Sequence, residues 1–157
     1  MENRKDHPAV YIPPPLIYVA TFFASVLVQK LVPLSKDFFH TSTSKIIGIV
    51  IILTGLFFNF PALHQFFKTK NTIITIKPAT SLQTTGIYAI SRNPMYISLV
   101  LIYIGLSFII GNWWSFILLP LLLLVVQEYV IKREEKYLER RFGQEYFNYK
   151  IKVRRWL

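Results

Sequence analysis

The sequence contains no cysteine, which excludes a disulfide scaffold, a cysteine nucleophile and thiolate metal sites. Acidic residues are also few, because 8 Asp and Glu stand against 18 Lys and Arg in 157 residues and give a net charge of +10. Such an excess can indicate nucleic-acid binding. Here, however, the basic residues flank long uncharged segments and form no continuous stripe. We therefore expect no nucleic-acid partner.

Charged residues are absent from three long segments. Residues 8–29 and 46–67 are uncharged runs of 22 residues each, and residues 93–127 form a run of 35. With 53% hydrophobic residues and a mean hydropathy of +0.40, the chain is also more apolar than a typical soluble domain. A helix of 22 residues rises about 33 Å, enough to cross a hydrocarbon core of about 30 Å. The sequence therefore predicts an all-α integral membrane protein with a single membrane domain over residues 1–157.

The three runs predict four transmembrane helices. The predicted spans are residues 15–34, 46–67, 95–110 and 113–132. The last two form a hairpin, because the third run is too long for one span and has Gly111-Asn112 near its middle. Pro61 and Pro120 lie inside predicted spans and indicate kinks rather than helix ends. Gly48 and Gly55, seven residues apart in the second span, indicate close contact with another helix.

Two segments outside the spans are strongly basic. The loop at residues 68–94 has four basic residues and no acid, and the tail at residues 133–157 is also rich in Lys and Arg. Basic loops tend to lie in the cytoplasm, so both segments are predicted to be cytoplasmic. With four spans, the amino and carboxyl termini then both lie on the cytoplasmic side.

The loop ends with polar groups where the third span begins. Tyr88, Arg92, Asn93 and Tyr96 lie within nine residues, and a helix that begins there offers unpaired N–H groups able to hold an anion. An alternative is that the two tyrosines form an interfacial aromatic belt and Arg92 anchors the topology. Earlier in the loop, residues 73–76 have a β-like pattern.

The start of the tail is predicted to be an amphipathic helix. An apolar stripe passes through Ile131, Leu138 and Phe142, with successive residues rotated by about 100°. On this wheel Glu134 and Glu135 border the apolar stripe from either side. Either they form weak exposed ion pairs, or one of them binds a cationic group of a ligand near the membrane surface.

Glu128 is a further acidic candidate, because it lies deeper in the fourth predicted span than the acids of the tail. An ionisable residue within a span is a functional candidate by default. It can also pair with a basic residue nearby.

Several short motifs follow one another in a fixed order over residues 77–157. They are Gly86-Ile87-Tyr88, Arg92-Asn93-Pro94-Met95-Tyr96, Glu134-Glu135, Leu138, Phe142-Gly143, Glu145-Tyr146, Tyr149 and Val153-Arg154. In this order they resemble the isoprenylcysteine carboxyl methyltransferase family. That resemblance implies a membrane enzyme that binds S-adenosylmethionine at the cytoplasmic ends of its last helices and methylates a lipophilic substrate from the bilayer.

The resemblance also implies a set of site residues. The implied cofactor-binding residues are Thr80, Ser81, Leu82, Gln83, Tyr88, Asn93, Pro94, Met95, Tyr96 and Glu134. The implied catalytic residues are Arg92, Asn93 and Glu134, and the candidate substrate contacts are Glu128 and Glu135. In this hypothesis Glu134 holds the cationic amino end of the cofactor, the tyrosines contact its sulfonium or adenosyl part, and Arg92 with Asn93 binds its carboxylate.

Two departures from the family pattern concern the methyl acceptor. Asn93 stands where the family usually has His, and the related phospholipid N-methyltransferases often have Asn-Pro-Met-Tyr there. Val130 aligns with an arginine that contacts prenylcysteine in the eukaryotic enzymes. The acceptor is therefore left open between a carboxyl and an amine. A carboxylate needs no base, whereas an amine must lose a proton, for which Glu128 or Glu135 is the candidate base.

Other classes of function are compatible with parts of the sequence. Membrane sterol reductases, which use NADPH, share a similar Arg-x-Pro-x-Tyr element, and a small four-helix transporter would use Glu128 as its coupled carboxylate. A family member that only binds lipid is a third alternative. A metal site is not expected, because the three histidines lie in different segments. The chain is compatible with a homodimer.

Overall fold

The computed structural model describes residues 7–68 and 78–157, and every regular element in these ranges is a helix. The elements are α1 (Pro14–Leu31), η1 (Asp37–His40), α2 (Ser42–Lys68), η2 (Gly86–Ala89), α3 (Pro94–Ile110), α4 (Trp113–Val125), η3 (Val126–Ile131), α5 (Lys132–Phe142) and α6 (Gln144–Lys152). The predicted all-α class is confirmed for this part of the chain. The β-like pattern at residues 73–76 lies outside the described residues.

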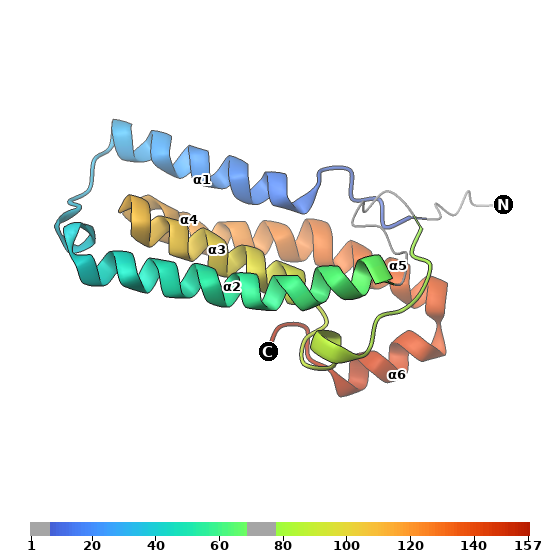
Figure 1. The fold of residues 1–157 in the computed structure, drawn as a ribbon. Helices are drawn as coiled ribbons and strands as arrows, with labels where there is room; N and C mark the ends of the chain where they lie inside the picture. Colours follow the sequence, from blue (N-terminus) through green and yellow to red (C-terminus); the bar gives the residue numbers. More distant parts are fainter. Residues whose placement is uncertain (1–6, 69–77) are drawn as a thin grey trace.

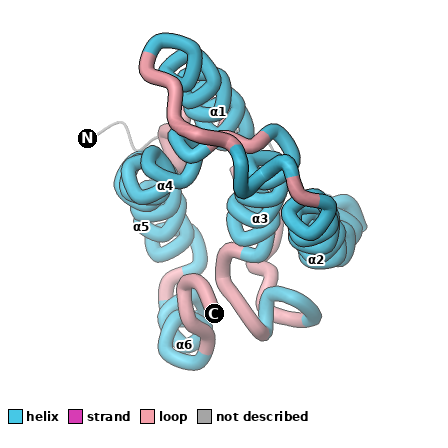
Figure 2. The backbone as a smooth tube through the Cα atoms, turned by 90° about the vertical axis from the view of Figure 1, so that its left-hand side faces the viewer, coloured by secondary structure: helices cyan, strands magenta, loops and turns pink. Residues whose placement is uncertain are grey.

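The long helices lie side by side as an elongated bundle (Figure 1). α2 packs along α3, and α1 packs along α4, so that α3 and α4 lie between the two outer helices. The view along the bundle shows α3 between α4 and α2, and α6 with the carboxyl terminus below α5 (Figure 2). In Figure 1, α6 lies at the right-hand end of the bundle. This end of the bundle also holds the start of α3 and the last turns of α2.

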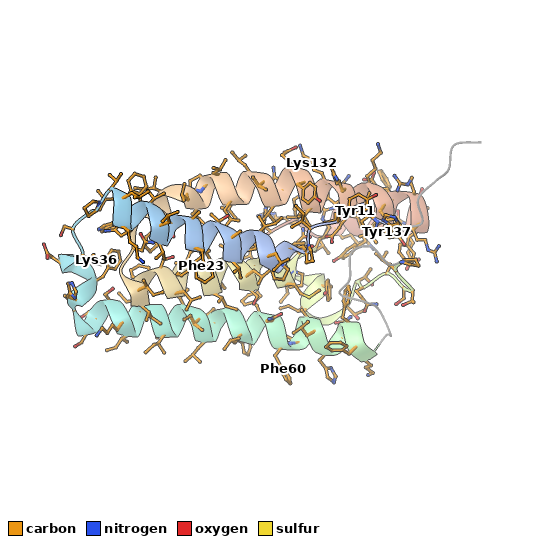
Figure 3. The ribbon with its side chains drawn as sticks, turned by 90° about the horizontal axis from the view of Figure 1, so that it is seen from above. Tyr11, Phe23, Lys36, Phe60, Lys132 and Tyr137 are labelled. Atoms are coloured by element: carbon orange, nitrogen blue, oxygen red, sulfur yellow. The ribbon has the colours of Figure 1, made fainter. Side chains whose placement is uncertain are left out.

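Within residues 7–68 and 78–157, three helices are long and apolar enough to cross a membrane: Pro14–Leu31, Ser42–Lys68 and the continuous rod Trp113–Phe142. α3 is apolar but shorter, with 17 residues. Large apolar side chains on the outer faces are exposed, such as Phe23 on α1 and Phe60 on α2, which is 75% exposed (Figure 3). Such extensive apolar exposure is expected of surfaces that face lipid.

The helix ends differ from the sequence expectations by more than one residue in three places. The first helix ends at Leu31 rather than at residue 34, because Pro33 disfavours helical backbone in the residue before it. The second helix begins four residues earlier than expected, at Ser42. The fourth helix does not end at residue 132, but continues through the π-helical turn η3 into α5. No glycine or proline interrupts residues 121–142, so the acids of the tail lie on an extension of the last span.

α2 and α3 approach each other closely at two glycines. A Cβ atom built on Gly48 would lie 2.7 Å from the carbonyl oxygen of Gly105. A Cβ built on Gly105 would lie 2.6 Å from the carbonyl oxygen of Gly48. Both distances are shorter than any side chain tolerates, so glycine at both positions permits this backbone contact, as small residues do between membrane helices.

α1 is held against the α3–α4 turn by buried polar groups. Asn112 Nδ2 donates to Ser25 Oγ at 2.9 Å, and the Ser25 and Ser115 hydroxyls lie 2.7 Å apart. The Tyr103 hydroxyl donates to the Ser115 carbonyl at 3.1 Å. Because Gly111 adopts a left-handed backbone (φ 70°) between α3 and α4, the chain reverses direction within two residues and places Asn112 in this network.

Candidate functional site

A cavity of about 400 Å³ lies at the end of the bundle where α3 begins and α5 leaves the apolar part of the rod. Its volume falls within the range of small-molecule sites, about 300–1,000 Å³. The lining comes from segments far apart in the sequence: Pro8, Pro14, Pro15, Asn59, Leu63, Phe66, Ala79, Ser81, Leu82, Gln83, Tyr88, Arg92, Asn93, Pro94, Met95, Tyr96, Leu99, Glu134, Glu135, Tyr137, Leu138, Tyr146 and Tyr149. One part of the wall is therefore apolar, and the other contains charged and hydrogen-bonding groups.

α5 and the loop before α3 form the polar wall of this cavity. Eight of the 11 residues of α5 are charged, so this helix lies outside the hydrocarbon region. The Ala79 backbone N–H donates to the Tyr137 hydroxyl at 2.9 Å and joins the loop to α5. Figure 3 shows Tyr137 at this end of the rod, beyond Lys132. The loop and α5 thus face each other across the cavity.

Glu134 is the acid of the cavity that has no basic partner among the described residues. Its Oε1 atom accepts a hydrogen bond from the Tyr96 hydroxyl at 2.8 Å. Burial raises the pKa of Glu134 to about 7, and the nearby Glu135 carboxylate adds to this rise, whereas the bond from Tyr96 opposes it. A buried carboxylate with unused acceptor capacity is a site for a cationic group.

Glu135, the next residue, is in the opposite electrostatic situation. Arg155 donates to it twice, from Nε to Oε1 at 2.9 Å and from Nη2 to Oε2 at 2.7 Å. Arg92 Nη1 lies 3.2 Å from the same Oε1 atom. Two guanidinium groups therefore neutralise Glu135, and the adjacent acids have different roles because only one of them is paired.

Two polar atoms of cavity-lining residues are buried without a hydrogen-bond partner in the described part of the chain: the Tyr88 hydroxyl and Arg92 Nε. Burial raises the pKa of the Tyr88 hydroxyl well above its usual range, so it stays protonated and able to donate. The Tyr88 carbonyl accepts from the Tyr149 hydroxyl at 2.6 Å, which fixes the loop against α6. Buried polar atoms without partners are uncommon in folded proteins, and at this position a ligand in the cavity can complete their bonding.

The cavity brings together most of the residues predicted from the sequence, which lie on η2, α3, α5 and the loop before them. Two of the predicted residues do not line it. Thr80 is exposed. Glu128 lies on the surface, with its side chain 54% exposed and 2.6 Å from Lys132 Nζ one helical turn away. Glu128 lies in the π-helical turn η3 on a side of the helix that faces outward rather than into the site.

Several lining residues were missed by the sequence analysis. Tyr146 and Tyr149 lie on one face of α6, and the three-residue spacing was the available signal for them. Arg155 does not line the cavity but binds the lining residue Glu135, and it was also missed because nothing local in the sequence distinguishes it from Arg154. Asn59 and Leu63 near the end of α2 had no chemical signature in the sequence. Their contribution depends on how α2 packs against α3.

Comparisons with known proteins place the chain in a family. The family model described as phospholipid methyltransferase matches residues 43–145, about two thirds of the chain. The chain therefore belongs to the phospholipid methyltransferase family, a group of membrane methyltransferases. The resemblance drawn from the motifs is confirmed by two fungal relatives, each named protein-S-isoprenylcysteine O-methyltransferase.

The relatives overlap different shares of the chain. The protein from Saccharomyces cerevisiae is 29% identical over 115 residues, which is 72% of this chain and 48% of the yeast protein. The protein from Schizosaccharomyces pombe is 38% identical over 72 residues, which is 46% of this chain and 30% of that protein. An uncharacterized protein from Haemophilus influenzae is 46% identical over its full 63 residues, 40% of this chain. The chain thus spans about half the length or less of the two named enzymes, and no solved structure matches it.

Proposed function

We propose that this chain is an S-adenosylmethionine-dependent methyltransferase that modifies a lipophilic carboxyl or amine acceptor at the cytoplasmic face of the membrane. The observation that supports this proposal most is Glu134, a buried carboxylate that faces a cavity of ligand size and has no basic partner among the described residues. The family of the chain and its fungal relatives support the reaction class.

The residues present fit a sulfonium methyl donor. S-adenosylmethionine has a cationic amino group and a sulfonium, for which Glu134 offers a negative charge. Tyr88 and Tyr96 line the same cavity and can interact with a cation through their rings, and the unpaired Tyr88 hydroxyl can donate to the donor's polar atoms. Arg92 offers its buried, unpartnered Nε atom as a donor to a carboxylate.

The chemistry demands little of the protein beyond binding and alignment. When bound, the cofactor would supply an electrophilic methyl group: the acceptor would form a bond to the methyl carbon in line with the breaking carbon–sulfur bond, and S-adenosylhomocysteine would leave. The protein residues then hold the two reactants in contact and exclude water, which together can lower the barrier by several kcal/mol. The apolar wall formed by Pro14, Leu63 and Leu99 is suited to the hydrophobic part of the acceptor.

Neither of the two residues that the sequence suggested as a base for an amine acceptor is placed to act as one. Glu128 is outside the cavity, and Glu135 is held by two arginines. Glu134, with a pKa of about 7, is the acid in the cavity that can accept a proton near neutral pH. A carboxylate acceptor would need no base, so both acceptor classes stay within the proposal. The transporter alternative has no support in the position of Glu128.

The proposal includes the membrane arrangement. α3 would be the fourth span: its 17 residues rise about 26 Å, slightly less than a typical hydrocarbon core. With α1, α2 and the rod Trp113–Phe142, this gives four crossings and places both termini on the side of the basic tail. The cavity then opens at the cytoplasmic membrane surface.

The direct test is methyl transfer by the purified full chain. The protein is incubated with radiolabelled S-adenosylmethionine and a total membrane lipid extract, and the labelled species is identified by mass spectrometry. We expect label in one lipophilic product, in a base-stable bond for an amine and a base-labile ester for a carboxyl. Absence of both cofactor binding and label, together with NADPH oxidation in the presence of a sterol, would favour the reductase alternative.

The affinity for S-adenosylmethionine is expected to rise with pH as Glu134 ionises. With a pKa of about 7 in the empty cavity, about one tenth of Glu134 is charged at pH 6 and about nine tenths at pH 8. Because only the charged form attracts the cation, the Kd at pH 6 should be about tenfold higher than at pH 8. Calorimetric titration at both pH values measures this ratio, and Glu134→Gln should abolish the difference.

A further inference from the structure

The carboxyl-terminal segment of the chain returns to the candidate site after α6 ends. The fork of the Arg155 guanidinium engages both carboxylate oxygens of Glu135, at 2.9 and 2.7 Å. Arg92 approaches Glu135 from the other side, with Nη1 3.2 Å from Oε1, and it also donates to the Tyr146 hydroxyl at 3.2 Å. Bidentate arginine–carboxylate pairs fix geometry as well as charge.

The backbone of the same segment holds the loop that precedes α3. The Arg155 carbonyl accepts from Asn93 Nδ2 at 2.9 Å and from Ser91 Oγ at 3.2 Å. Next to it, the Arg154 carbonyl accepts from the Arg92 backbone N–H at 3.0 Å. Three consecutive loop residues are therefore tied to two consecutive residues near the carboxyl terminus. Ser91 is fully buried, so water does not substitute for these bonds.

We propose that Arg155 is a positioning residue for the candidate methyl-transfer site. It holds Glu135 with its side chain and Asn93 with its carbonyl, and it thereby fixes Arg92 and keeps Glu134 as the one uncompensated acid in the cavity. This proposal depends on the proposed function, because Arg155 does not itself line the cavity and would affect methyl transfer only through the residues that it holds. On this proposal the last arginine of the sequence, Arg155, belongs to the site rather than to the membrane surface.

The neutralisation of Glu135 decides how Glu134 titrates. Glu134 is faced by Glu135 on its own helix, by Tyr96 on α3 and by Tyr88 on η2, and the positive charges nearby are those of Arg92 and Arg155 on Glu135. Removing the guanidinium of Arg155 leaves two carboxylates to share Arg92. The unmasked charge of Glu135 then disfavours ionisation of Glu134, so the titration of Glu134 moves to higher pH.

The test compares Arg155→Gln with Arg154→Gln in the full chain. Arg154 is adjacent, exposed and equally charged, and among the described residues its side chain forms no ion pair with Glu135, so it is a matched control for loss of one positive charge. The first readout is the carboxyl stretching band of cofactor-free protein during a pH titration, in which Glu134→Gln identifies the band of Glu134. The second is the affinity for S-adenosylmethionine at pH 7.

For Arg155→Gln we expect the titration midpoint of Glu134 to rise by about one pH unit and the Kd at pH 7 to rise about fivefold to tenfold. Arg154→Gln should leave both unchanged, and Arg155→Lys should recover part of the shift because it restores the charge without the fork. A midpoint that does not move in Arg155→Gln, or that moves equally in Arg154→Gln, overturns the positioning role. The band titration needs no cofactor, so failure of the proposed function would appear separately, as absence of binding in the unmodified chain.

Discussion

Replacing Glu134 by glutamine is expected to weaken S-adenosylmethionine binding by about 30- to 150-fold. Glutamine keeps the size of the side chain and still accepts the hydrogen bond from Tyr96, but it removes the negative charge of the buried acid. A charge-assisted hydrogen bond to a buried group contributes about 2–3 kcal/mol, which corresponds to this loss of affinity. Isothermal titration calorimetry of the purified chain at pH 8, where Glu134 is ionised, measures the change.

Two comparisons separate this effect from general damage. Glu145→Gln removes an acid from the exposed start of α6, outside the cavity, and should bind the cofactor as the parent does. Thermal unfolding of Glu134→Gln should occur at or above the parent temperature, because a neutral amide is easier to bury than a carboxylate whose pKa is already raised to about 7. Equal affinity in Glu134→Gln and parent would remove Glu134 from the cofactor site.

The second large effect is expected at the contact of α2 with α3. In Gly105→Val the new Cβ would meet the Gly48 carbonyl oxygen at 2.6 Å and the Ile52 side chain at 2.6 Å. A backbone carbonyl cannot rotate away as a flexible side chain does, so the two helices must separate along part of their length. Overpacking of this kind costs about 3 kcal/mol, which for a chain of this size lowers the melting temperature by about 6–12 °C.

The same substitution should also disturb the site, because α2 supplies Asn59 and Leu63 to the cavity and α3 supplies Tyr96. Thermal unfolding in detergent and cofactor binding are therefore measured together. Leu106→Val is the matched control, since it alters the neighbouring residue, which is 37% exposed on the other face of α3. For a chain of this size, a shift of about 2 °C corresponds to about 1 kcal/mol or less. If the melting temperature of Gly105→Val lies within about 2 °C of that of Leu106→Val, the glycine contact is not a packing constraint.

Much of the helical framework could be predicted because its signal is local. An uncharged run of 22 residues must be helical in a bilayer, where each backbone N–H and C=O needs a partner within the segment. The ends of the helices were less certain from sequence. Whether the last span stops at residue 132 depends on continuation through the π-helical turn, and no residue pattern marks that choice.

The sequence predicted some residues of the candidate site correctly and others wrongly, because it reports local spacing but not the packing of distant segments. Periodicity placed Glu134 and Glu135 beside the apolar stripe of one helix, and both line the cavity. Glu128, by contrast, was singled out by its depth in an apolar run. Depth along the chain does not indicate in which direction around the helix axis a side chain points. It lies on the outer surface.

By itself the sequence determined the helical class, the membrane character and the motifs that relate the chain to methyltransferases. Each of these depends on the type and spacing of residues that are close together in the chain. Only the tertiary structure decided which of two adjacent glutamates stays unpaired. The partners that neutralise Glu135 are Arg92, in the loop before α3, and Arg155, which lies 20 residues after Glu135 and beyond the end of α6. Electrostatic pairing depends on distance in space, and chain reversal at Gly143 brings together charges that the linear order keeps apart.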